Sequence, residues 1–332
     1  MNKQDLPWIE KHRPKSLNDI SGQDEIIKLL KKCVEQKNIQ HMLFYGLQGT
    51  GKTSTIHSLA YELYGPLYKQ RVLEMNASDE RGIAVVRDKI STFAAGIVSG
   101  DVTFKLVILD EADSMTSEAQ SALKRIIEKF TNITRFCLIC NDVSKIDSSL
   151  ISRCAVFRFK PLPDDVLKSR LDYICKKESI KVSNEAKKEV FKIARGDLRS
   201  SITLLQSASQ LSSDEIVSAE SVIKISGMLP RELIDSLWNS WNTGKFTNVQ
   251  KIITTIIHEG YSASVLISQL YQQILREDDD DYDDNKLKHN EQQRMDMFIV
   301  LAEADKSLID GANEELQLLN VAVKFLRILN TN

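Results

Sequence analysis

The stretch Gly46-Leu-Gln-Gly-Thr-Gly-Lys-Thr53 decides the fold, because it fits the spacing Gly-x-x-x-x-Gly-Lys-Ser/Thr. An apolar run, Met42–Tyr45, precedes the stretch, and a helical pattern over Lys52–Tyr64 follows it. Glycines in such a loop let backbone N–H groups and the helix N-terminus point at one phosphate. A chance glycine-rich turn is a common explanation of the bare pattern, but the correct flanks on both sides argue against it. We therefore predict a phosphate-binding loop in which Lys52 reaches the β- and γ-phosphates and Thr53 helps to hold Mg²⁺.

A second apolar run ends in carboxylates, in the order Leu106-Val-Ile-Leu-Asp110-Glu111-Ala-Asp113. Ligands of parallel sheets bind at the edge where strands end, which brings these carboxylates to the phosphate-binding loop. We expect Asp110 to hold Mg²⁺ through water and Glu111 to orient or activate the attacking water. For this run taken alone, the alternative is a buried strand that ends in a polar cap. The presence of the phosphate-binding loop in the same chain argues against that alternative.

A third apolar run, Phe136–Ile139, ends at Cys140-Asn141, and we expect the Asn141 amide to position the same water or to sense the γ-phosphate. Alone, Asn141 would be an ordinary residue at a strand end. The residues together predict nucleotide hydrolysis. No Asn-Lys-x-Asp run, the signal for guanine selection, follows the phosphate-binding loop, which favours ATP over GTP.

The composition sets limits on the protein class. The chain has 332 residues, enough for two or three domains, with 42% apolar and 27% charged residues, as in soluble globular proteins. The net charge of −2 gives no global basic field, so any contact with nucleic acid needs a local basic stripe. Five cysteines without framework spacing favour reduced thiols in the cytosol or nucleus, and Cys137-Leu-Ile-Cys140 fits a strand core better than a metal half-site. We find no signal peptide and no apolar run of membrane-spanning length.

Short apolar strands alternate with amphipathic helices over the first half of the chain, the pattern of an α/β domain whose parallel sheet has helices on both faces. One of these helices, Met115–Phe130, has a possible capping box made by Ser117 and Gln120. Residues 162–226 predict short helices, with Asp197 as the N-cap of one of them, and residues 227–332 predict an all-helical block. An acidic stretch at residues 277–284 interrupts that block and is expected to be solvated. The predicted domains are residues 1–161, 162–226 and 227–332. The expected strands are Met42–Tyr45, Val72–Asn76, Lys105–Asp110, Phe136–Asn141 and Ala155–Phe159.

Several stretches resemble known motifs. The loop, the Asp-Glu-Ala-Asp run, Asn141 as sensor 1 and Gly196-Asp-Leu-Arg199 as sensor 2 are similar to AAA+ ATPases. Within that class, Pro7-Trp-Ile-Glu-Lys-His-Arg-Pro14 resembles the N-terminal box of clamp-loader small subunits. Glu74-Met-Asn-Ala-Ser-Asp-Glu-Arg-Gly82 and Ser152-Arg153-Cys154 resemble two further motifs of the same subunits. The resemblance covers essentially the whole chain and indicates replication factor C, eukaryotic or eukaryote-like.

Three other stretches look most like one branch of that family, the branch numbered two in yeast and four in human. They are His41-Met-Leu-Phe-Tyr-Gly46, Thr134-Arg-Phe-Cys-Leu-Ile-Cys-Asn141 and Gln317-Leu-Leu-Asn320. The sequence also departs from the family pattern. His12 stands where the family usually has tyrosine, and Leu47-Gln48 replaces the usual Pro-Pro, which makes the loop more flexible.

The resemblance implies a nucleotide site. Ile9, Arg13 and Ile20 would lie against the adenine and ribose, and Arg199 would touch the γ-phosphate from a helical lid. The loop would hold ATP through Gly46, Leu47, Gln48, Gly49, Thr50, Gly51, Lys52, Thr53 and Ser54.

Arg153 has no obvious partner in the local sequence. In the family arrangement it lies on the far side of its domain from the phosphate-binding loop. We expect it to act in trans, as an arginine finger at a neighbouring subunit's ATP. A structural arginine that pairs with a carboxylate at the strand start is the alternative, and the local sequence alone would favour it.

The resemblance also implies partners. Five subunits would assemble, open the ring-shaped sliding clamp PCNA and close it around primer–template DNA in the nucleus. Arg81, Ile83, Arg87 and Lys124 are candidates for contacts with the DNA backbone, although each cation could equally be a solvated surface charge. The C-terminal block would be the collar that oligomerises, where apolar residues such as Val321, Phe325 and Ile328 could equally be internal core.

Two rival functions are left open by the sequence. The chain could be a structural partner that binds nucleotide and scarcely turns it over, although the presence of Lys52 and Glu111 argues against this. It could also be a related AAA+ motor, such as a branch-migration helicase.

Overall fold

The structure, a computed structural model, describes the chain except for residues 1–5, 78–82, 97–101, 212–215, 276–288 and 331–332, and it omits the side chains of residues 83–87. Two compact units are present, Met1–Gln210 and Leu211–Asn332. The acidic stretch at residues 277–284 lies outside the described residues. No helix in the described ranges is long and apolar enough to cross a membrane.

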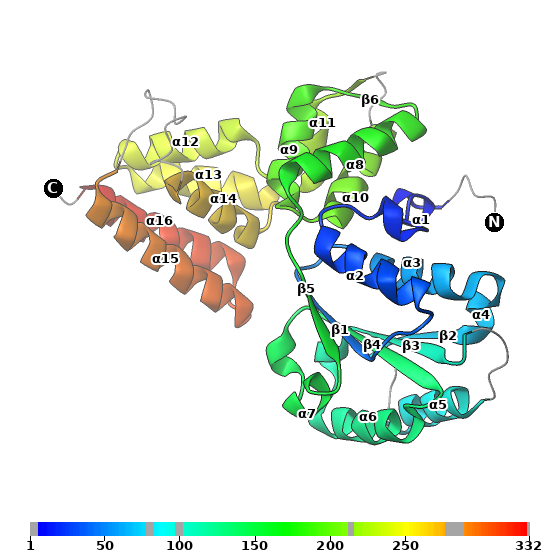
Figure 1. Cartoon of the computed structure of the whole chain (residues 1–332). Helices are drawn as coiled ribbons and strands as arrows, with labels where there is room; N and C mark the ends of the chain where they lie inside the picture. The colour runs from blue at the N-terminus through cyan, green and yellow to red at the C-terminus, as the bar shows by residue number, and fades with distance from the viewer. Residues whose placement is uncertain (1–5, 78–82, 97–101, 212–215, 276–288, 331–332) are drawn as a thin grey trace. The chain divides into compact units, whose positions relative to one another are not determined.

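The first unit contains a sheet of five parallel strands in the order β2-β3-β4-β1-β5 (Figure 1). Every strand expected from the sequence is present, and the main difference is that β4 starts two residues earlier than expected. All five strands end at the same edge because they are parallel. The phosphate-binding loop follows β1 and the carboxylate run follows β3, so both lie at this edge. The strands are β1 Met42–Gly46, β2 Val72–Asn76, β3 Lys105–Asp110, β4 Thr134–Cys140 and β5 Ala155–Phe159.

Helices cover both faces of the sheet, with α2 and α3 on one side and α5 and α6 on the other (Figure 1). Alternate residues of each strand point to opposite faces, so the central strands bury side chains in two separate cores. Cys137 and Cys140 illustrate this alternation, since they lie in different cores and are both buried. Their expected role as strand core is therefore confirmed. The helices around the sheet are α1 Trp8–Lys11, α2 Asp24–Glu35, α3 Lys52–Tyr64, α4 Tyr68–Arg71, α5 Ile83–Ala95, α6 Ser117–Phe130 and α7 Ser148–Ile151, with short 3₁₀ turns η1 Leu17–Asp19, η2 Gly65–Leu67, η3 Ala112–Ser114 and η4 Val143–Lys145.

The start of α6 differs from the expected capping box. Thr116, rather than Ser117, is the N-cap, and its side-chain oxygen accepts a hydrogen bond from the Ala119 N–H. Gln120 is buried and its amide donates to the carbonyl oxygens of Met115 and Lys145. The expected cap was wrong by one residue. The Gln120 side chain does not take part in a capping box, because its hydrogen bonds connect α6 to the turn after β4.

The rest of the first unit is a group of helices after the sheet, with a two-residue strand β6, Lys181–Val182. The predicted N-cap of α10 is confirmed, because Asp197 Oδ1 accepts hydrogen bonds from the N–H groups of Arg199 and Ser200 at 2.8 and 3.3 Å. This cap fixes where the helix that carries Arg199 begins. The helices are α8 Asp164–Lys177, α9 Asn184–Ala194 and α10 Leu198–Leu211.

The described residues of the second unit form helices and a two-residue strand, and those within 227–332 are helical, as the sequence predicted. Its core contains Trp241 and Phe325, whose rings lie 5.0 Å apart. Val321 and Phe325 are almost fully buried in this core, and Ile328 packs against it. Of the two roles left open for these three side chains, internal core is the correct one. The elements are β7 Ile216–Val217, α11 Ala219–Ser226, α12 Arg231–Asn242, α13 Phe246–His258, α14 Ala263–Leu275, α15 Glu291–Ile309 and α16 Glu314–Asn330.

Candidate functional site

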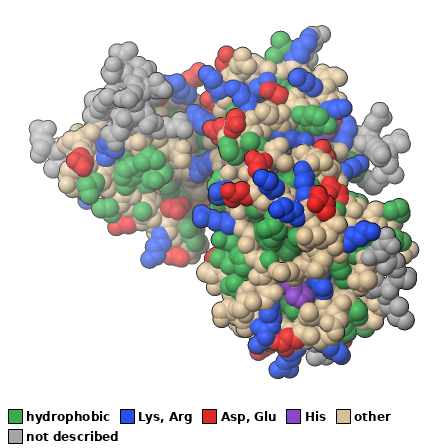
Figure 2. Space-filling model, in the orientation of Figure 1, with side chains coloured by type: hydrophobic (Ala, Val, Ile, Leu, Met, Phe, Trp, Pro, Cys, Tyr) green, Lys and Arg blue, Asp and Glu red, His purple; other side chains and the backbone are tan. Residues whose placement is uncertain are grey.

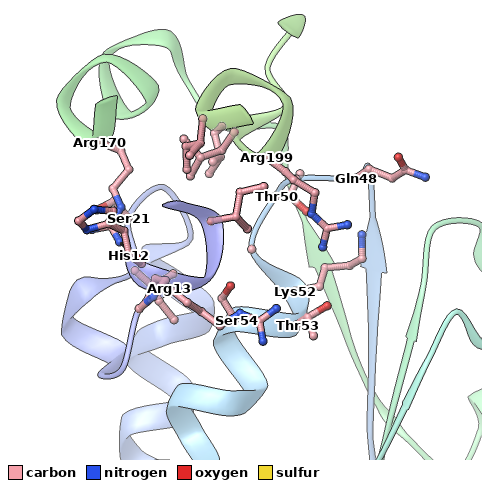
Figure 3. Close-up of a pocket in the computed structure, with 18 of the residues that line it drawn as sticks. His12, Arg13, Ser21, Gln48, Thr50, Lys52, Thr53, Ser54, Arg170 and Arg199 are labelled. Carbon is pink, nitrogen blue, oxygen red and sulfur yellow. Dashed lines mark hydrogen bonds between the residues drawn. The ribbon is translucent and has the colours of Figure 1, made fainter. Parts of the chain in front are cut away.

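A cavity of about 220 Å³ opens at the carboxyl edge of the sheet, between the phosphate-binding loop, the N-terminal segment and helices α8 and α10 (Figure 3). It brings together residues that the sequence placed in five separate motifs. Gly46 and Leu47 do not line the cavity, and the Leu47 side chain is exposed to solvent. The sequence-predicted residues that line it are Ile9, Arg13, Ile20, Gln48, Gly49, Thr50, Gly51, Lys52, Thr53, Ser54, Asp110, Glu111, Asn141 and Arg199.

Glycines give the phosphate-binding loop its shape. Gly51, the N-cap of α3, has φ of +93°, which places it in the left-handed region that favours glycine. Gly49 has φ of +71°, and a Cβ added there would lie 1.8 Å from Oδ1 of Asp197. The loop therefore needs glycine at position 49 both for its backbone turn and for the close approach of α10.

Lys52 is buried in the first turn of α3. Its Nζ donates to the carbonyl oxygens of Gly46 and Leu47 at 2.8 Å each, and to Oδ1 of Asn141 at 3.1 Å. Burial lowers the pKa of the Lys52 amine, and the Asp110 carboxylate opposes that shift. A phosphate beside this amine would supply a full negative charge where the loop supplies only carbonyl and amide dipoles. The site thus favours an anion at Lys52.

The oxygens of Thr53 and Asp110 meet where the loop faces β3. Thr53 Oγ1 donates to Asp110 Oδ2 at 2.9 Å, and Asp110 Oδ1 accepts from the Glu111 N–H at 2.9 Å. A hydroxyl and a carboxylate are the kind of oxygen ligands that Mg²⁺ takes beside substrate phosphates. These two residues therefore fit the predicted ion. Glu111 has φ of +53°, a conformation that is uncommon outside glycine, so the chain turns sharply where this carboxylate enters the cavity.

Asn141 is held by a residue to which the sequence gave no separate role. Asp113 Oδ2 accepts hydrogen bonds from the N–H groups of Asn141 and Asp142, both at 3.2 Å. This carboxylate joins the turn after β3 to the end of β4, and so fixes the distance between Asn141 and the Asp110-Glu111 pair. The only sequence signal for it was its place at the end of the Asp-Glu-Ala-Asp run.

Arg199 reaches the same cavity from α10. Figure 3 shows Arg199 and Lys52 pointing toward the same part of it. The two charges are close enough for Arg199 to lower the pKa of Lys52, although burial has the larger effect. Two cations that point toward the same part of the cavity (Figure 3) are well placed for a polyphosphate.

The other end of the cavity is apolar, and the sequence revealed only part of it. Leu162, Val166, Leu198 and Ile202 line it beside the expected Ile9 and Ile20. These four positions belong to the apolar faces of α8 and α10 and the turn before α8. Periodicity marks such faces without saying whether they meet core or ligand, so no sequence signal distinguished these residues. The further lining residues that the sequence did not single out for this role are His12, Pro14, Asp19, Ser21 and Arg170.

Arg153 does not line this cavity. It follows α7, its Nη2 lies 2.5 Å from Oε1 of Glu128, and its Nη1 donates to the Ser149 carbonyl oxygen at 2.6 Å. The local sequence gave it no partner because Glu128 lies 25 positions away, on α6. About a third of the Arg153 side chain stays exposed. The structure therefore contains the carboxylate pair of the alternative interpretation and keeps the guanidinium at the surface.

The DNA-contact candidates are only partly described. Arg81 lies outside the described residues. Ile83 and Arg87 lie in α5, but only their backbone is described. Lys124 is half-buried on α6. On the face of the molecule drawn in Figure 2, lysine and arginine side chains are interspersed with aspartate and glutamate. This mixture is consistent with the net charge of −2.

A cluster of three or more His, Cys, Asp or Glu side chains able to hold a metal by themselves is not found in the described part of the chain.

Comparison with protein families gives three consecutive matches. The family called "ATPase family associated with various cellular activities" matches residues 42–162. The "RCF1/5-like, AAA+ ATPase lid domain" matches residues 169–210, which include Arg170 and Arg199. The "Replication factor C C-terminal domain" matches residues 229–324. The expected fold class is confirmed: an AAA+ nucleotide-binding domain, a helical lid and a C-terminal helical domain.

Curated relatives are similar to nearly the whole chain. Replication factor C subunit 4 of Homo sapiens is 44% identical, over 98% of this chain and 90% of that protein. Replication factor C subunit 2 of Saccharomyces cerevisiae is 41% identical, over 97% of this chain and 93% of that protein. An archaeal relative, the replication factor C small subunit of Saccharolobus solfataricus, is 40% identical, over 95% of this chain and 92% of that protein. The expected resemblance to the branch numbered two in yeast and four in human is confirmed.

Among solved structures, the RuvB Holliday junction branch migration motor of Thermotoga maritima has a similar fold. Its TM-score is 0.54 at 19% identity, over 79% of this chain and 85% of that one. At this identity the likeness concerns the fold alone, which is the AAA+ fold that the family match also gives. The matches over sequence decide the family: the chain belongs to the replication factor C small subunits and is an ATPase subunit of a clamp loader.

Proposed function

We propose that this chain binds ATP and Mg²⁺ in the cavity between the phosphate-binding loop and the lid. In a five-subunit assembly with other replication factor C subunits, it hydrolyses that ATP to open PCNA and close it around primer–template DNA in the nucleus. One observation carries the proposal. A single cavity is lined by the loop, the carboxylates after β3, the amide after β4 and the arginine of the lid.

In this proposal the loop holds the β- and γ-phosphates through backbone N–H groups and Lys52. Lys52 exchanges its carbonyl and amide partners for phosphate oxygens, and Arg199 contacts the γ-phosphate from α10. Because Arg199 belongs to the lid, its contact makes the lid's position depend on the nucleotide. Ile9, Ile20 and the apolar lid residues enclose the adenine and ribose, and they exclude water from that end.

Thr53 and Asp110 would hold Mg²⁺, which neutralises negative charge on the phosphates when it is bound. Glu111 lies at the cavity wall next to this pair and is the candidate to take a proton from the attacking water. Asn141 lies 3.1 Å from Lys52 Nζ and is the candidate to orient that water. Asp113 supports this role, since it holds the backbone of Asn141.

Arg153 is proposed to complete a neighbour's site. It stands at the surface, outside the cavity of its own chain. The guanidinium has an exposed carboxylate partner in Glu128, and an exposed ion pair is worth only about 1 kcal/mol or less. A neighbour's γ-phosphate can therefore compete with Glu128 for Arg153.

The proposed contacts with DNA are Arg81, Ile83, Arg87 and Lys124, which would touch the backbone of the primer–template without reading its sequence. The proposed domains stay those of the sequence: residues 1–161 for nucleotide binding, 162–226 for the lid and 227–332 for the collar.

Substituting Lys52→Ala in the reconstituted five-subunit complex tests the proposal. We expect ATP binding by this subunit to be lost, together with its share of DNA-stimulated hydrolysis and clamp loading, because the buried amine is the main cation beside the phosphates. Lys28→Ala, an exposed lysine on α2, is the control. An unchanged rate of hydrolysis and unchanged loading by Lys52→Ala would remove this site from the reaction and leave a structural subunit.

The same assay separates the proposal from a branch-migration motor. Stimulation of the ATPase by primed DNA should depend on PCNA in a clamp loader and should be independent of PCNA in a helicase.

A further inference from the structure

The N-terminal segment Trp8–Leu17 lies between the lid and the phosphate-binding helix α3. Ile9, His12, Arg13 and Pro14 all line the nucleotide cavity. A segment made of one short helix and turns must be held by specific contacts if it is to form one wall of a binding site. The contacts that hold it show which elements determine its position.

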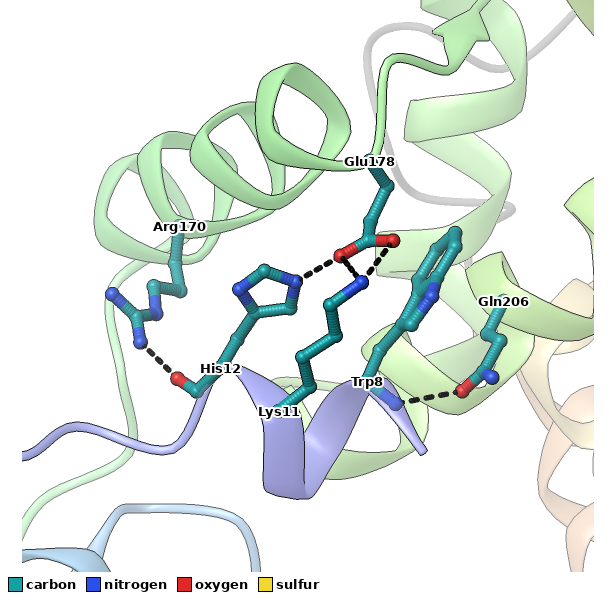
Figure 4. A network of polar contacts seen from close by, with 6 residues as sticks. All are labelled: Trp8, Lys11, His12, Arg170, Glu178 and Gln206. Atoms are coloured by element: carbon teal, nitrogen blue, oxygen red, sulfur yellow. Dashed lines mark hydrogen bonds and ion pairs between the residues drawn. The ribbon is translucent and has the colours of Figure 1, made fainter. Parts of the chain in front are cut away.

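One carboxylate of the lid makes two of these contacts (Figure 4). Glu178, the C-cap of α8, lies 2.8 Å from Lys11 Nζ and 2.5 Å from His12 Nε2. The exposed fractions of the side chains are 12% for Glu178 and 9% for His12. Burial raises the pKa of Glu178, but hydrogen bonds from Lys11 and His12 outweigh burial and hold it below its ordinary value. The Glu178 carboxylate is therefore a charged anchor that is mostly shielded from solvent.

Two backbone contacts lie on either side of this anchor (Figure 4). Arg170 Nη2 of α8 donates to the His12 carbonyl oxygen at 2.5 Å, and the Trp8 N–H donates to Oε1 of Gln206 on α10 at 3.0 Å. The Tyr173 ring of α8 meets the His12 ring edge-on at 6.3 Å. The first half of the segment is thus bound to both lid helices that line the cavity.

The other end of the segment is bound to α3, the helix that begins at Lys52. Ser58 Oγ donates to the Pro14 carbonyl oxygen at 3.1 Å, and Glu62 Oε1 accepts from the Leu17 N–H at 2.8 Å. The segment therefore runs as a strap from the lid to the helix of the phosphate-binding loop, and it lines the cavity on the way.

We propose that Glu178 is a positioning residue for nucleotide binding, which holds the strap Trp8–Leu17 to the lid so that Ile9 and Arg13 stand at the cavity wall. The inference rests on the proposed function, since it requires ATP in this cavity. Glu178 does not line the cavity and acts only through Lys11 and His12. His12 occupies the position where the family pattern has tyrosine, so one of the two contacts to this anchor belongs to a departure from that pattern.

The strap makes lid position and nucleotide binding depend on each other. When ATP draws Arg199 and the lid toward the phosphates, the lid carries Glu178 and the strap with it. When the anchor is lost, the lid can still close, but the strap is then held to it only through Arg170 and Gln206, so Ile9 and Arg13 follow the lid less closely. Loss of Glu178 should therefore weaken nucleotide binding and leave the hydrolytic groups Asp110 and Glu111 in place.

Equilibrium binding of a fluorescent ATP analogue to the full-length chain tests this role. We expect Glu178→Gln to raise the Kd about three- to tenfold, because it removes a charge that two partners share in a protected position. Lys11→Met should give a smaller rise, since His12 still holds the carboxylate. The matched control is Asp172→Asn, which removes a carboxylate of α8 that pairs with Lys187 at 2.6 Å, away from the strap.

A charge exchange distinguishes positioning from general loss of structure. In Lys11→Glu with Glu178→Lys, the ion pair can re-form across the same gap while the contact with His12 is not restored, so part of the lost affinity should return, although each single exchange should bind weakly. In the reconstituted complex, Glu178→Gln should raise KM for ATP and leave kcat unchanged. A Kd for Glu178→Gln equal to that of Asp172→Asn would overturn the inference, and so would failure of the charge exchange to restore binding in a variant whose Tm matches the control.

The Lys52→Ala variant separates this outcome from failure of the proposed function. If Lys52→Ala abolishes binding and Glu178→Gln does not change it, the cavity binds ATP and only the role of Glu178 is wrong. If neither variant changes binding, ATP does not bind in the cavity.

Discussion

The two ends of the nucleotide cavity are built in different ways. At the phosphate end, most of the groups lie at the ends of strands of one parallel sheet. Asp110 ends β3, Glu111 and Asn141 directly follow β3 and β4, and Lys52 and Thr53 follow the loop after β1, while Arg199 is the contribution of the lid. At the base end, the walls come from the N-terminal segment, the turn after it and two lid helices far along the chain. The sheet fixes the first end, whereas the second exists only while the lid and the strap are in place.

This difference indicates that the two ends of the cavity contribute differently to hydrolysis and to nucleotide affinity. Groups on a rigid sheet edge keep the geometry that hydrolysis requires, since side chains on a scaffold hold their positions better than those on loops. Groups on the lid and strap can move together and so report whether nucleotide is bound. Chemistry should therefore depend on the phosphate end, and affinity and lid position on the base end.

The largest effect should come from the group that completes the phosphate end from outside. In the reconstituted complex, Arg153→Ala should lower hydrolysis at the neighbouring site about 10³-fold or more, as expected for an arginine finger supplied in trans. ATP binding by this chain itself should not change, because Arg153 does not line its own cavity. Single-turnover hydrolysis, with the neighbour as the only competent subunit, measures the effect.

Arg158→Ala, an exposed arginine on β5, is the matched control for that experiment. If Arg153→Ala instead costs this chain its own nucleotide, the trans role is wrong and the Glu128 pair is structural. In that case the phosphate end is complete within one chain.

The next effect concerns the carboxylate at the cavity wall. Glu111→Gln keeps the shape of the side chain and removes its ability to take a proton, so kcat at this site should fall about 100-fold or more. The Kd for ATP should stay within about twofold, because Lys52, Arg199 and the base end are intact. Glu118→Gln at the exposed start of α6 is the control. A variant that loses binding and turnover together would show that Glu111 shapes the cavity instead of acting on water.

The sequence predicted the phosphate end well for a physical reason. Its residues come from short motifs in which a strand, a turn and a functional side chain are contiguous, so the local pattern also specifies the place in the fold. The same reasoning located all five strands and the Asp197 cap of α10. It misplaced the cap of α6 by one residue because both Thr116 and Ser117 can cap, and only tertiary contacts of Gln120 choose between them.

The base end and the strap were largely beyond prediction from the sequence itself. His12 and Glu178 are 166 positions apart, and nothing in either local pattern indicates the other. Val166 and Ile202 carry the periodicity of any amphipathic helix, so only the fold shows that they face a cavity. Arg153 shows the same limit, because its partner Glu128 belongs to another helix. Contacts between distant segments depend on tertiary packing, which the local spacing of residue types does not specify.

The smallest effect should come from the base end. Ile9 is half-buried at the cavity wall, so Ile9→Ala removes part of an apolar contact with the adenine and ribose and should raise the Kd about three- to fivefold. Equilibrium binding of the ATP analogue measures this change, and Leu29→Ala, an apolar residue of α2 that is 48% exposed, is the control. Turnover at saturating ATP should be unchanged, because no group at the sheet edge is altered. A fall in kcat with unchanged Kd would reverse the division between the two ends and would mean that the strap, through its anchors on α3, helps to set the geometry of hydrolysis.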